Sequence, residues 1–266
     1  IEVLMEKFIV SPSPHLTSGT GVKKIMWSVN LSLLPATAGA VYFFGFSVLK
    51  IIGVTIFAAV ATEAVILSLR RKPVVISDGS AFLTGLLLAL NLPQNIPLWL
   101  AVLGAVFAIG IVKQAFGGLG RNIFNPALGG RVFLLLAYAS YMTTKWAAPR
   151  GGLISIDGVT SATPLTVLFE AGRTLSDPES AEAARVLAHQ HLEGLYSSGM
   201  LMRLFTGDVG GCIGETSVIL LLIGAAFLLW RGYITWHIPV SFLGTLAVFS
   251  WILWVPRVNG PFEGNG

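Results

Sequence analysis

Long apolar runs, separated by short turns and by one extended polar stretch, are the feature that most restricts the fold of this chain. Several runs reach the ~18 residues that a membrane-spanning helix needs, and none alternates with the period of two that marks a barrel strand. Charged residues make up only 11% of the chain, against ~25% in an average soluble domain. The sequence therefore predicts an all-α polytopic membrane protein.

The apolar segments number about seven. Their approximate ranges are 25–46, 51–69, 79–92, 97–115, 123–142, 213–230 and 233–255. The third is shorter than a bilayer requires at ~1.5 Å per residue, and it ends at Asn91-Leu92-Pro93. We expect this segment to be a half-length or broken helix.

Similar glycine-rich turns, residues 117–122 and 207–214, lead into two of the segments. The similarity predicts a worn internal repeat, and broken helices in repeats are typical of transport folds, whose freed backbone groups line a cavity. Glycines that only permit tight turns explain the pattern equally well. We expect a lead, a first transmembrane repeat, a polar loop, the transmembrane part of a second repeat and a tail, with the bounds 1–24, 25–142, 143–211, 212–255 and 256–266.

Basic residues adjoin the ends of the segments rather than forming a patch, so the net charge of +4 does not predict a nucleic-acid partner. If every segment crosses, one side of the membrane holds Lys23, Lys24, Arg70, Arg71, Lys72, Lys113, Arg121 and Arg231. The positive-inside rule makes that side cytoplasmic. The amino terminus is then expected in the cytoplasm and the polar loop outside it.

Metal and cysteine chemistry is restricted by the composition. Cys212 is the only cysteine, so the chain can close no intrachain disulfide and cannot by itself hold a four-cysteine iron–sulfur cluster. His189 and His191 lack an evident third ligand, and a solvated loop face explains them better than a metal does. No metal site and no catalytic residue are predicted, and a redox centre wholly inside the chain must be organic.

Charged residues in or beside the apolar segments are candidates for an ion path. Glu63 lies within the second segment, where a buried carboxylate is costly unless it faces a cavity or a partner, although an interhelical hydrogen bond also explains it. Asp78 precedes the short third segment, where helix capping explains it as well as ion binding does. We expect Lys113, Asn122 and Asn125 at the membrane interface or near a broken turn, where they position the turn.

Near the start of the polar loop stands Asp157-Gly158-Val159-Thr160-Ser161-Ala162-Thr163-Pro164. Serine and threonine beside glycine and proline commonly cap helices and form turns, so these residues alone predict a turn. Because titratable groups are few in the surrounding segments, a threonine-rich turn displayed at the membrane surface is the most plausible place for chemistry.

Four motifs occur in an order that resembles a known family. They are residues 13–19 with 33–36, residues 78–81 with 90–93, residues 117–127, and residues 157–163. Together they resemble the membrane D subunit of the Rnf ion-translocating ferredoxin:NAD oxidoreductase complex, whose close relative is the B subunit of the sodium-pumping NADH:quinone oxidoreductase. The likeness extends over nearly the whole chain.

The resemblance implies a cofactor and a site. The D subunit carries FMN joined through its phosphate to a threonine hydroxyl, and the family's attachment motif maps onto residues 160–163 with Thr163 as the acceptor. A separate flavin transferase would read the other motif residues, which are Asp157, Gly158, Thr160, Ser161 and Ala162. A second, noncovalent flavin such as riboflavin is also implied.

The resemblance also implies a fold and a setting. Family members have a urea-transporter-like helix bundle built from inverted repeats, with more spans than this chain contains, so we expect the second repeat to be incomplete. Rnf complexes couple electron flow between ferredoxin and NAD to ion movement across the cytoplasmic (inner) membrane of bacteria or archaea. The implied partners are other membrane and iron–sulfur subunits, the flavin transferase and membrane lipid.

Three functional hypotheses follow. The first is a flavoprotein subunit of an ion-coupled translocase that is inactive alone, with a B-type subunit of a sodium-pumping NADH:quinone oxidoreductase as its near alternative. The second is a channel or transporter for a small solute without a redox role, and the third is a membrane scaffold that docks redox partners. A covalently bound flavin separates the first hypothesis from the other two.

Overall fold

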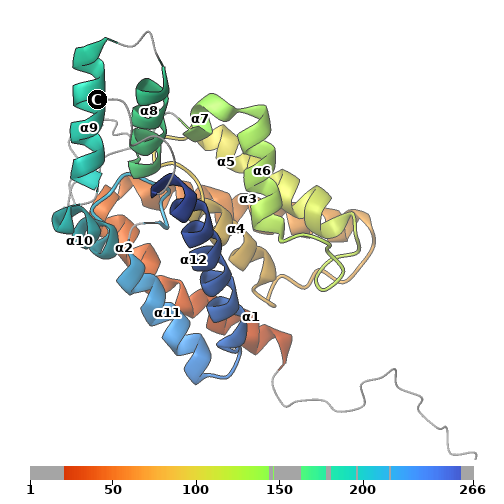
Figure 1. Ribbon diagram of the computed structural model, residues 1–266. Helices are drawn as coiled ribbons and strands as arrows, with labels where there is room; N and C mark the ends of the chain where they lie inside the picture. The colour runs from red at the N-terminus through yellow and green to blue at the C-terminus, as the bar shows by residue number, and fades with distance from the viewer. Residues whose placement is uncertain are drawn as a thin grey trace, which may run out of the picture.

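The computed structural model describes residues 21–143, 146, 163–177, 181–195, 197–215 and 217–258, and all regular structure in these ranges is helical (Figure 1). The helices, in chain order, are α1 Val22–Ser32, α2 Leu34–Phe44, α3 Ser47–Leu69, α4 Ser80–Leu90, α5 Leu98–Phe107, the π-helix η1 Ala108–Gln114, α6 Pro126–Ala137, α7 Ala139–Thr143, α8 Pro164–Ser176, α9 Glu182–Leu195, α10 Ser198–Thr206, α11 Val218–Trp230 and α12 His237–Val258.

Each apolar segment of the sequence contains a helix. The stretches Val22–Phe44 and Ser47–Leu69 are long and apolar enough to cross a membrane, while the other apolar helices in the described ranges are shorter. Helix α4 has 11 residues, so the prediction of a half-length third helix is correct. The all-helical fold is therefore confirmed in the described ranges, and its apolar helices are consistent with a membrane protein, whereas the inverted repeat stays a prediction.

The core lies where α3, α4, α5 and α6 pack together, and small residues make the close approach possible. Gly85 of α4 faces the backbone of α3, where a Cβ would stand 2.7 Å from the Cα of Ile56. Gly104 of α5 faces a side chain of α6, where a Cβ would stand 2.6 Å from Cδ1 of Leu134. Without a strong hydrophobic drive between helices in lipid, such close backbone packing is a main source of helix association.

The carboxyl end of α4 is closed by a distant part of the chain. The backbone N–H groups of Ile213 and Gly214 donate to the carbonyls of Leu92 and Leu90, at 3.0 and 2.7 Å. The side chain of Gln94 donates to the carbonyl of Gly211 at 2.6 Å. A helix that stops inside the molecule leaves its last carbonyls without intrahelical partners, and the 211–214 turn supplies them.

The structure of the glycine-rich turns supports the simpler explanation, that the glycines permit tight turns. Gly117, Gly118 and Gly120 have positive φ, and Gly207 ends α10 in the left-handed conformation at φ 101°. These conformations are strained for residues with a side chain, so the glycines are required for the turns themselves. The internal repeat has no further support from this geometry.

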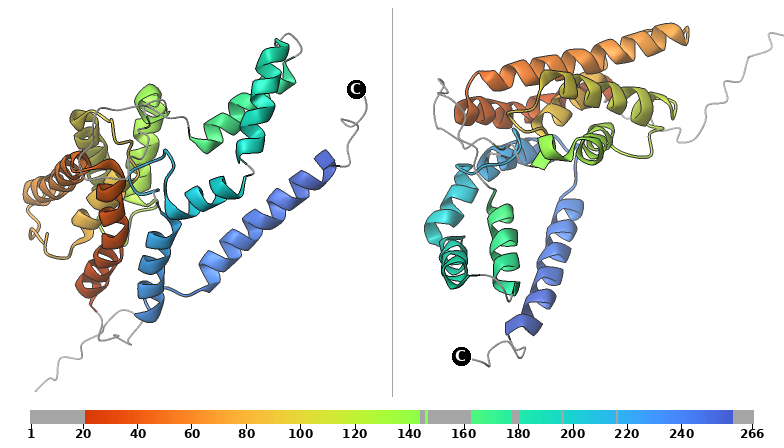
Figure 2. Two further views of the ribbon diagram at one scale, coloured as in Figure 1. Left: turned by 90° about the vertical axis from the view of Figure 1, so that its left-hand side faces the viewer. Right: turned by 90° about the horizontal axis from the view of Figure 1, so that it is seen from above.

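The helices of the polar loop stand apart from the main group. Figure 2 shows α8, α9 and α12 projecting to one side of the helices α1 to α7 in both views. Helices α8 and α9 pack against each other. The loop therefore carries its own small helical unit, and Thr163 lies at its beginning.

We expect Gly85→Ala to lower the thermal stability of the purified protein. Alanine gains ~1 kcal/mol over glycine in a helix interior, but overpacking against a backbone costs ~1–3 kcal/mol, and at Gly85 the methyl group would meet Ile56 and Ala59. Gly53→Ala in α3 is the matched control, because nothing lies within 4 Å of its Cβ position. Thermal unfolding in detergent should show a loss only for Gly85→Ala. Equal stability of the two variants would contradict the packing described.

Candidate functional site

The structure describes Thr163 and Pro164 at the end of the threonine-rich motif, whereas residues 157–162 lie outside the described ranges. Thr163 is the N-cap of α8, with extended backbone dihedrals and Pro164 in the first helical position. Its Oγ1 accepts a hydrogen bond from the N–H of Thr166 at 3.2 Å and lies 2.8 Å from the Thr166 hydroxyl. The turn that the residues alone predicted is therefore a helix cap.

The surroundings of Thr163 suit an anion better than they suit catalysis. The side chain is half-buried, and the described contacts of its hydroxyl are the N–H and the hydroxyl of Thr166, neither of which is a general base. The amino end of a helix presents N–H groups and the positive end of the helix dipole. A phosphoester on Oγ1 would lie at this end of α8, so the position of the hydroxyl is compatible with such a linkage.

A second polar site lies at the amino end of α4. Glu63 of α3 and Lys113 of η1 form an ion pair of 2.7 Å between Oε1 and Nζ, and both side chains are at least 95% buried. Gln114 donates to the same Oε1 at 2.7 Å, and Arg70 donates to the carbonyl of Gln114 at 2.7 Å. Glu63 thus has the interhelical partner that makes a buried carboxylate tolerable.

The network continues to Asp78. Lys113 Nζ donates to Ser80 Oγ at 2.7 Å, and Ser80 donates to Asp78 through both its hydroxyl and its N–H, at 2.8 and 3.1 Å. Asp78 directly precedes Gly79, the N-cap residue of α4, and is half-buried. The structure therefore brings the two predicted ion-path residues, Glu63 and Asp78, into one line through Lys113 and Ser80.

Lys113 corrects a prediction. The sequence predicts that it lies at the membrane interface, as a topology signal, or near a broken turn, but only 1% of the residue is exposed. The interfacial interpretation was wrong because a lysine near the end of an apolar run can either reach water or turn inward to a carboxylate, and the partner Glu63 is 50 positions away. Asn122 and Asn125 do position the turn, bonding to the Phe124 carbonyl and to the Ala127 N–H.

A pocket of about 360 Å³ adjoins the network. Its volume falls in the ~300–1,000 Å³ range of small-molecule sites, and apolar walls with a few convergent polar groups are typical of them. Polar and apolar side chains both line it: Met26, Ser80, Leu83, Thr84, Leu87, Lys113, Leu119, Asn122, Ile123, Phe124, Asn125 and Pro126. Lys113 thus connects the pocket to the buried carboxylate.

The opposite end of α4 carries a separate polar cluster that no sequence pattern predicted. Arg131 of α6 donates to Asn91 at 2.7 Å and lies 3.5 Å from Glu215, whose other oxygen accepts from the Cys212 N–H. Burial, helped by the Glu215 carboxylate, raises the pKa of the Cys212 thiol to about 12. The thiol is therefore protonated and unreactive near neutral pH. The sequence signal that could have indicated this cluster is Glu215, a charged residue directly after the glycine-rich turn 207–214.

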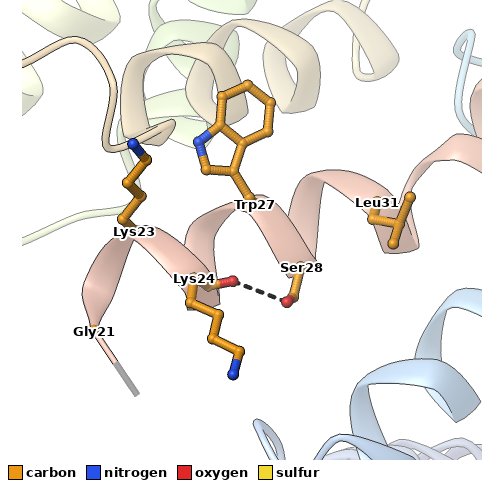
Figure 3. Close-up of a pocket in the computed structure, with 6 residues that line it drawn as sticks. All are labelled: Gly21, Lys23, Lys24, Trp27, Ser28 and Leu31. Carbon is orange, nitrogen blue, oxygen red and sulfur yellow. Dashed lines mark hydrogen bonds between the residues drawn. The ribbon is translucent and has the colours of Figure 1, made fainter. Parts of the chain in front are cut away.

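A larger hollow of about 530 Å³ runs along the first turns of α1 (Figure 3). Trp27 stands at one side, and Ser28 donates to the carbonyl of Lys24 at 2.8 Å. The lining comes from residues 21–31 alone, with Lys23 beside Lys24, and is largely apolar. Helix α11 packs against α1, and the Ser28 side chain lowers the pKa of Tyr233, which follows α11. Tryptophan, tyrosine and lysine together are typical of a membrane interface.

His189 and His191 lie on the exposed surface of α9. Among the described residues, no group of three histidine, cysteine, aspartate or glutamate side chains is placed to hold a metal ion.

Comparison with known proteins gives consistent results. Residues 9–263 match the NQR2, RnfD, RnfE family. The chain is 44% identical over 243 residues to the D subunit of the Na(+)-translocating ferredoxin:NAD(+) oxidoreductase complex of Acetobacterium woodii, covering 91% of this chain and 68% of that protein. It is 42% identical over 259 residues to the D subunit of the proton-translocating ferredoxin:NAD(+) oxidoreductase complex of Clostridium ljungdahlii, covering 97% and 72%.

A third relative, the D subunit of the ion-translocating oxidoreductase complex of Citrobacter koseri, is 37% identical over 262 residues, covering 93% of this chain and 74% of its own length. The residues that match the family, 9–263, include the α4 network, the α10–α11 turn and the polar loop. The chain belongs to the NQR2, RnfD, RnfE family.

Proposed function

We propose that this chain is the membrane D subunit of an ion-translocating ferredoxin:NAD oxidoreductase complex. It relays electrons through an FMN attached to Thr163 and takes part in coupling their flow to ion movement, and it is inactive without its partner subunits. Family membership and relatives named as D subunits support the assignment. One flavin and one buried cysteine cannot connect soluble donors to the membrane, so other membrane and iron–sulfur subunits supply the remaining centres.

The observation that carries the proposal is the position of the Thr163 hydroxyl. It lies at the amino end of a 13-residue helix, in a half-buried setting, and ends the motif at 157–163. Bound FMN would supply one-electron and two-electron transfer, and the chain's own contribution is to fix its place. Asp157, Gly158, Thr160, Ser161 and Ala162 are proposed as the sequence that the flavin transferase recognises.

The pocket beside Lys113 fits a second, noncovalent flavin such as riboflavin. Its volume of about 360 Å³ suits a small cofactor. Lys113, Ser80 and Thr84 provide hydrogen-bonding groups on one side, and Asn122 and Asn125 provide amides. Such a ring would lie directly against the Glu63–Lys113 pair.

Glu63 and Asp78 are proposed as ion-path residues. The motivating observation is that a buried carboxylate and a half-buried one share a hydrogen-bonded line at the amino end of the short helix α4. Short and interrupted helices are where secondary transporters place their ion sites.

The proposed setting is the cytoplasmic (inner) membrane of a bacterium or archaeon, in contact with lipid, with the amino terminus inside and the polar loop outside. A urea-transporter-like inverted repeat is the proposed full fold. A channel for a small solute is the second candidate, because the pocket beside Lys113 also fits a small polar molecule. A B-type subunit of a sodium-pumping NADH:quinone oxidoreductase belongs to the same family. A covalent flavin would exclude the channel and scaffold alternatives.

The FMN assignment is tested by denaturation, because an ester-linked flavin stays on an unfolded chain. The protein produced with its flavin transferase should give a flavin-fluorescent band on a denaturing gel, and Thr163→Asn should abolish the band. Asparagine caps helices as well as threonine does, so this variant removes the acceptor hydroxyl while keeping α8.

Thr166→Ala is the matched control, since the Thr166 hydroxyl lies 2.8 Å from that of Thr163. This variant should keep the fluorescent band. A band that persists in Thr163→Asn, or an adduct placed on another residue by peptide mass analysis, would show that the assignment is wrong.

Glu63→Gln should reduce ion movement per electron transferred, or slow turnover, with normal flavin content. The substitution keeps the side-chain shape and removes the charge that Lys113 pairs with, so the effect is electrostatic. Ion uptake into vesicles containing the whole complex, measured beside electron transfer, checks this expectation. Wild-type coupling in Glu63→Gln would remove Glu63 from the ion path.

The orientation is tested by cysteine labelling. Cys212 gives little background because it is buried and its pKa is raised to about 12. Gln190→Cys on the exposed surface of α9 should react with an impermeant maleimide in intact cells, while Lys72→Cys, also exposed, should react only in inverted vesicles. The reverse pattern would invert the topology.

A further inference from the structure

Lys113 has two acceptors at the same distance. Its Nζ lies 2.7 Å from Glu63 Oε1 and 2.7 Å from Ser80 Oγ. A lysine ammonium group has three donors on a flexible side chain, so a small movement can exchange one hydrogen-bond acceptor for the other. Because Ser80 is itself bonded to Asp78, Lys113 stands between two carboxylates.

The carboxylate of Glu63 has unused capacity. Its Oε2 is buried and has no hydrogen-bond partner among the described residues, while Oε1 receives both Lys113 and Gln114. Buried carboxylate oxygens normally have partners, and an exception points to a further group that binds there. A small cation or a proton at Oε2 would complete the carboxylate.

Charge balance decides how such a cation can bind. The Glu63–Lys113 pair is neutral as it stands, and a further cation beside it would bury a net positive charge with no counter-charge, which is strongly unfavourable. The cation and the ammonium therefore exclude each other at Glu63. A second position is available to the ammonium, because Lys113 Nζ already donates to Ser80 Oγ, which in turn donates to Asp78.

We propose that Lys113 is a tethered counter-cation that holds the Glu63 site when no transported cation is present. A small monovalent cation, a sodium ion or a proton, displaces it, and the ammonium moves toward Ser80 and Asp78. The inference rests on the proposed role of Glu63 in the ion path. It adds a mechanism that keeps the Glu63 site electrically neutral both with and without the transported cation. Ser80 and Asp78 form the second binding position of the Lys113 ammonium.

The π-helix explains how this mechanism is built. Lys113 and Gln114 are consecutive residues, yet both reach the same carboxylate oxygen. The helix widens over Ala108–Gln114, and such π-helical turns occur preferentially at functional sites. Lys113 thus reaches Glu63 from a π-helical segment, whereas the helices around it are α-helical.

Labelling with dicyclohexylcarbodiimide tests the proposal without relying on turnover. The reagent enters membranes, and a protonated carboxyl group adds to it to give a stable N-acylurea with no leaving group, which peptide mass analysis locates. Burial without a counter-cation favours the neutral form of a carboxyl group. In the intact complex, Lys113→Met should label at Glu63 about tenfold faster than wild type, in the range of ordinary coupling between ligands. Glu63→Gln is the blank.

Ser80→Ala separates a movable counter-cation from a static ion pair. Without the Ser80 hydroxyl the ammonium should stay on Glu63. Labelling of Glu63 should therefore fall several-fold below that of wild type, measured after an incubation in which half of the wild-type protein is labelled. Loosening of a static pair would raise it. Labelling of Ser80→Ala equal to or faster than wild type, or of Lys113→Met no faster than wild type, would overturn the proposal.

Replacing choline chloride with sodium chloride identifies the cation. Protection of Lys113→Met by sodium shows that a sodium ion takes the place of the ammonium, and labelling insensitive to sodium shows that a proton does. If Lys113→Met fails to assemble, the Ser80→Ala result decides alone. Normal ion coupling in Glu63→Gln would defeat the proposed ion path together with this inference, whereas loss of coupling there with unchanged labelling in Lys113→Met would defeat this inference only.

Discussion

The obligation to bond every backbone group inside a membrane shapes the centre of this protein. Helix α4 has 11 residues, less than half of α3 beside it, so both of its ends lie within the molecule. Its last carbonyls are closed by Ile213 and Gly214, and its first turn is closed by Asp78. A half-length helix is stable in this position only because other segments complete its ends.

Both polar clusters follow from that constraint. At the amino end of α4, Ser80 meets Lys113 and, through it, Glu63; at the carboxyl end, Asn91 meets Arg131. Helix interiors in a bilayer have no polar backbone to offer, so polar side chains collect where helices stop. The pocket beside Lys113 lies at one of these ends, which is the expected place for a ligand in such a fold.

Much of the fold could be predicted from the sequence, because apolar run length and the Asn91-Leu92-Pro93 stop are local signals. The role of Lys113 could not, because its partner Glu63 comes from another helix and both directions of a lysine side chain are compatible with the local pattern. The contact between Arg131 and Glu215 could not be predicted for the same reason, because the two residues come from distant segments. Thr163 is the converse case: its cap geometry is local, but a capping hydroxyl and an acceptor hydroxyl have identical chemistry, so only the family resemblance distinguishes them.

The separation of the sites sets a condition on how they can act together. Thr163 begins the helical unit of the polar loop, and that loop returns to the core at residues 211–214, where it bonds the carboxyl end of α4. The ion pair touches the amino end of the same helix. Helix α4 therefore contacts the 211–214 turn at its carboxyl end and Lys113 at its amino end. The short helix is thus a physical connection between the loop that carries the threonine and the carboxylate buried on α3.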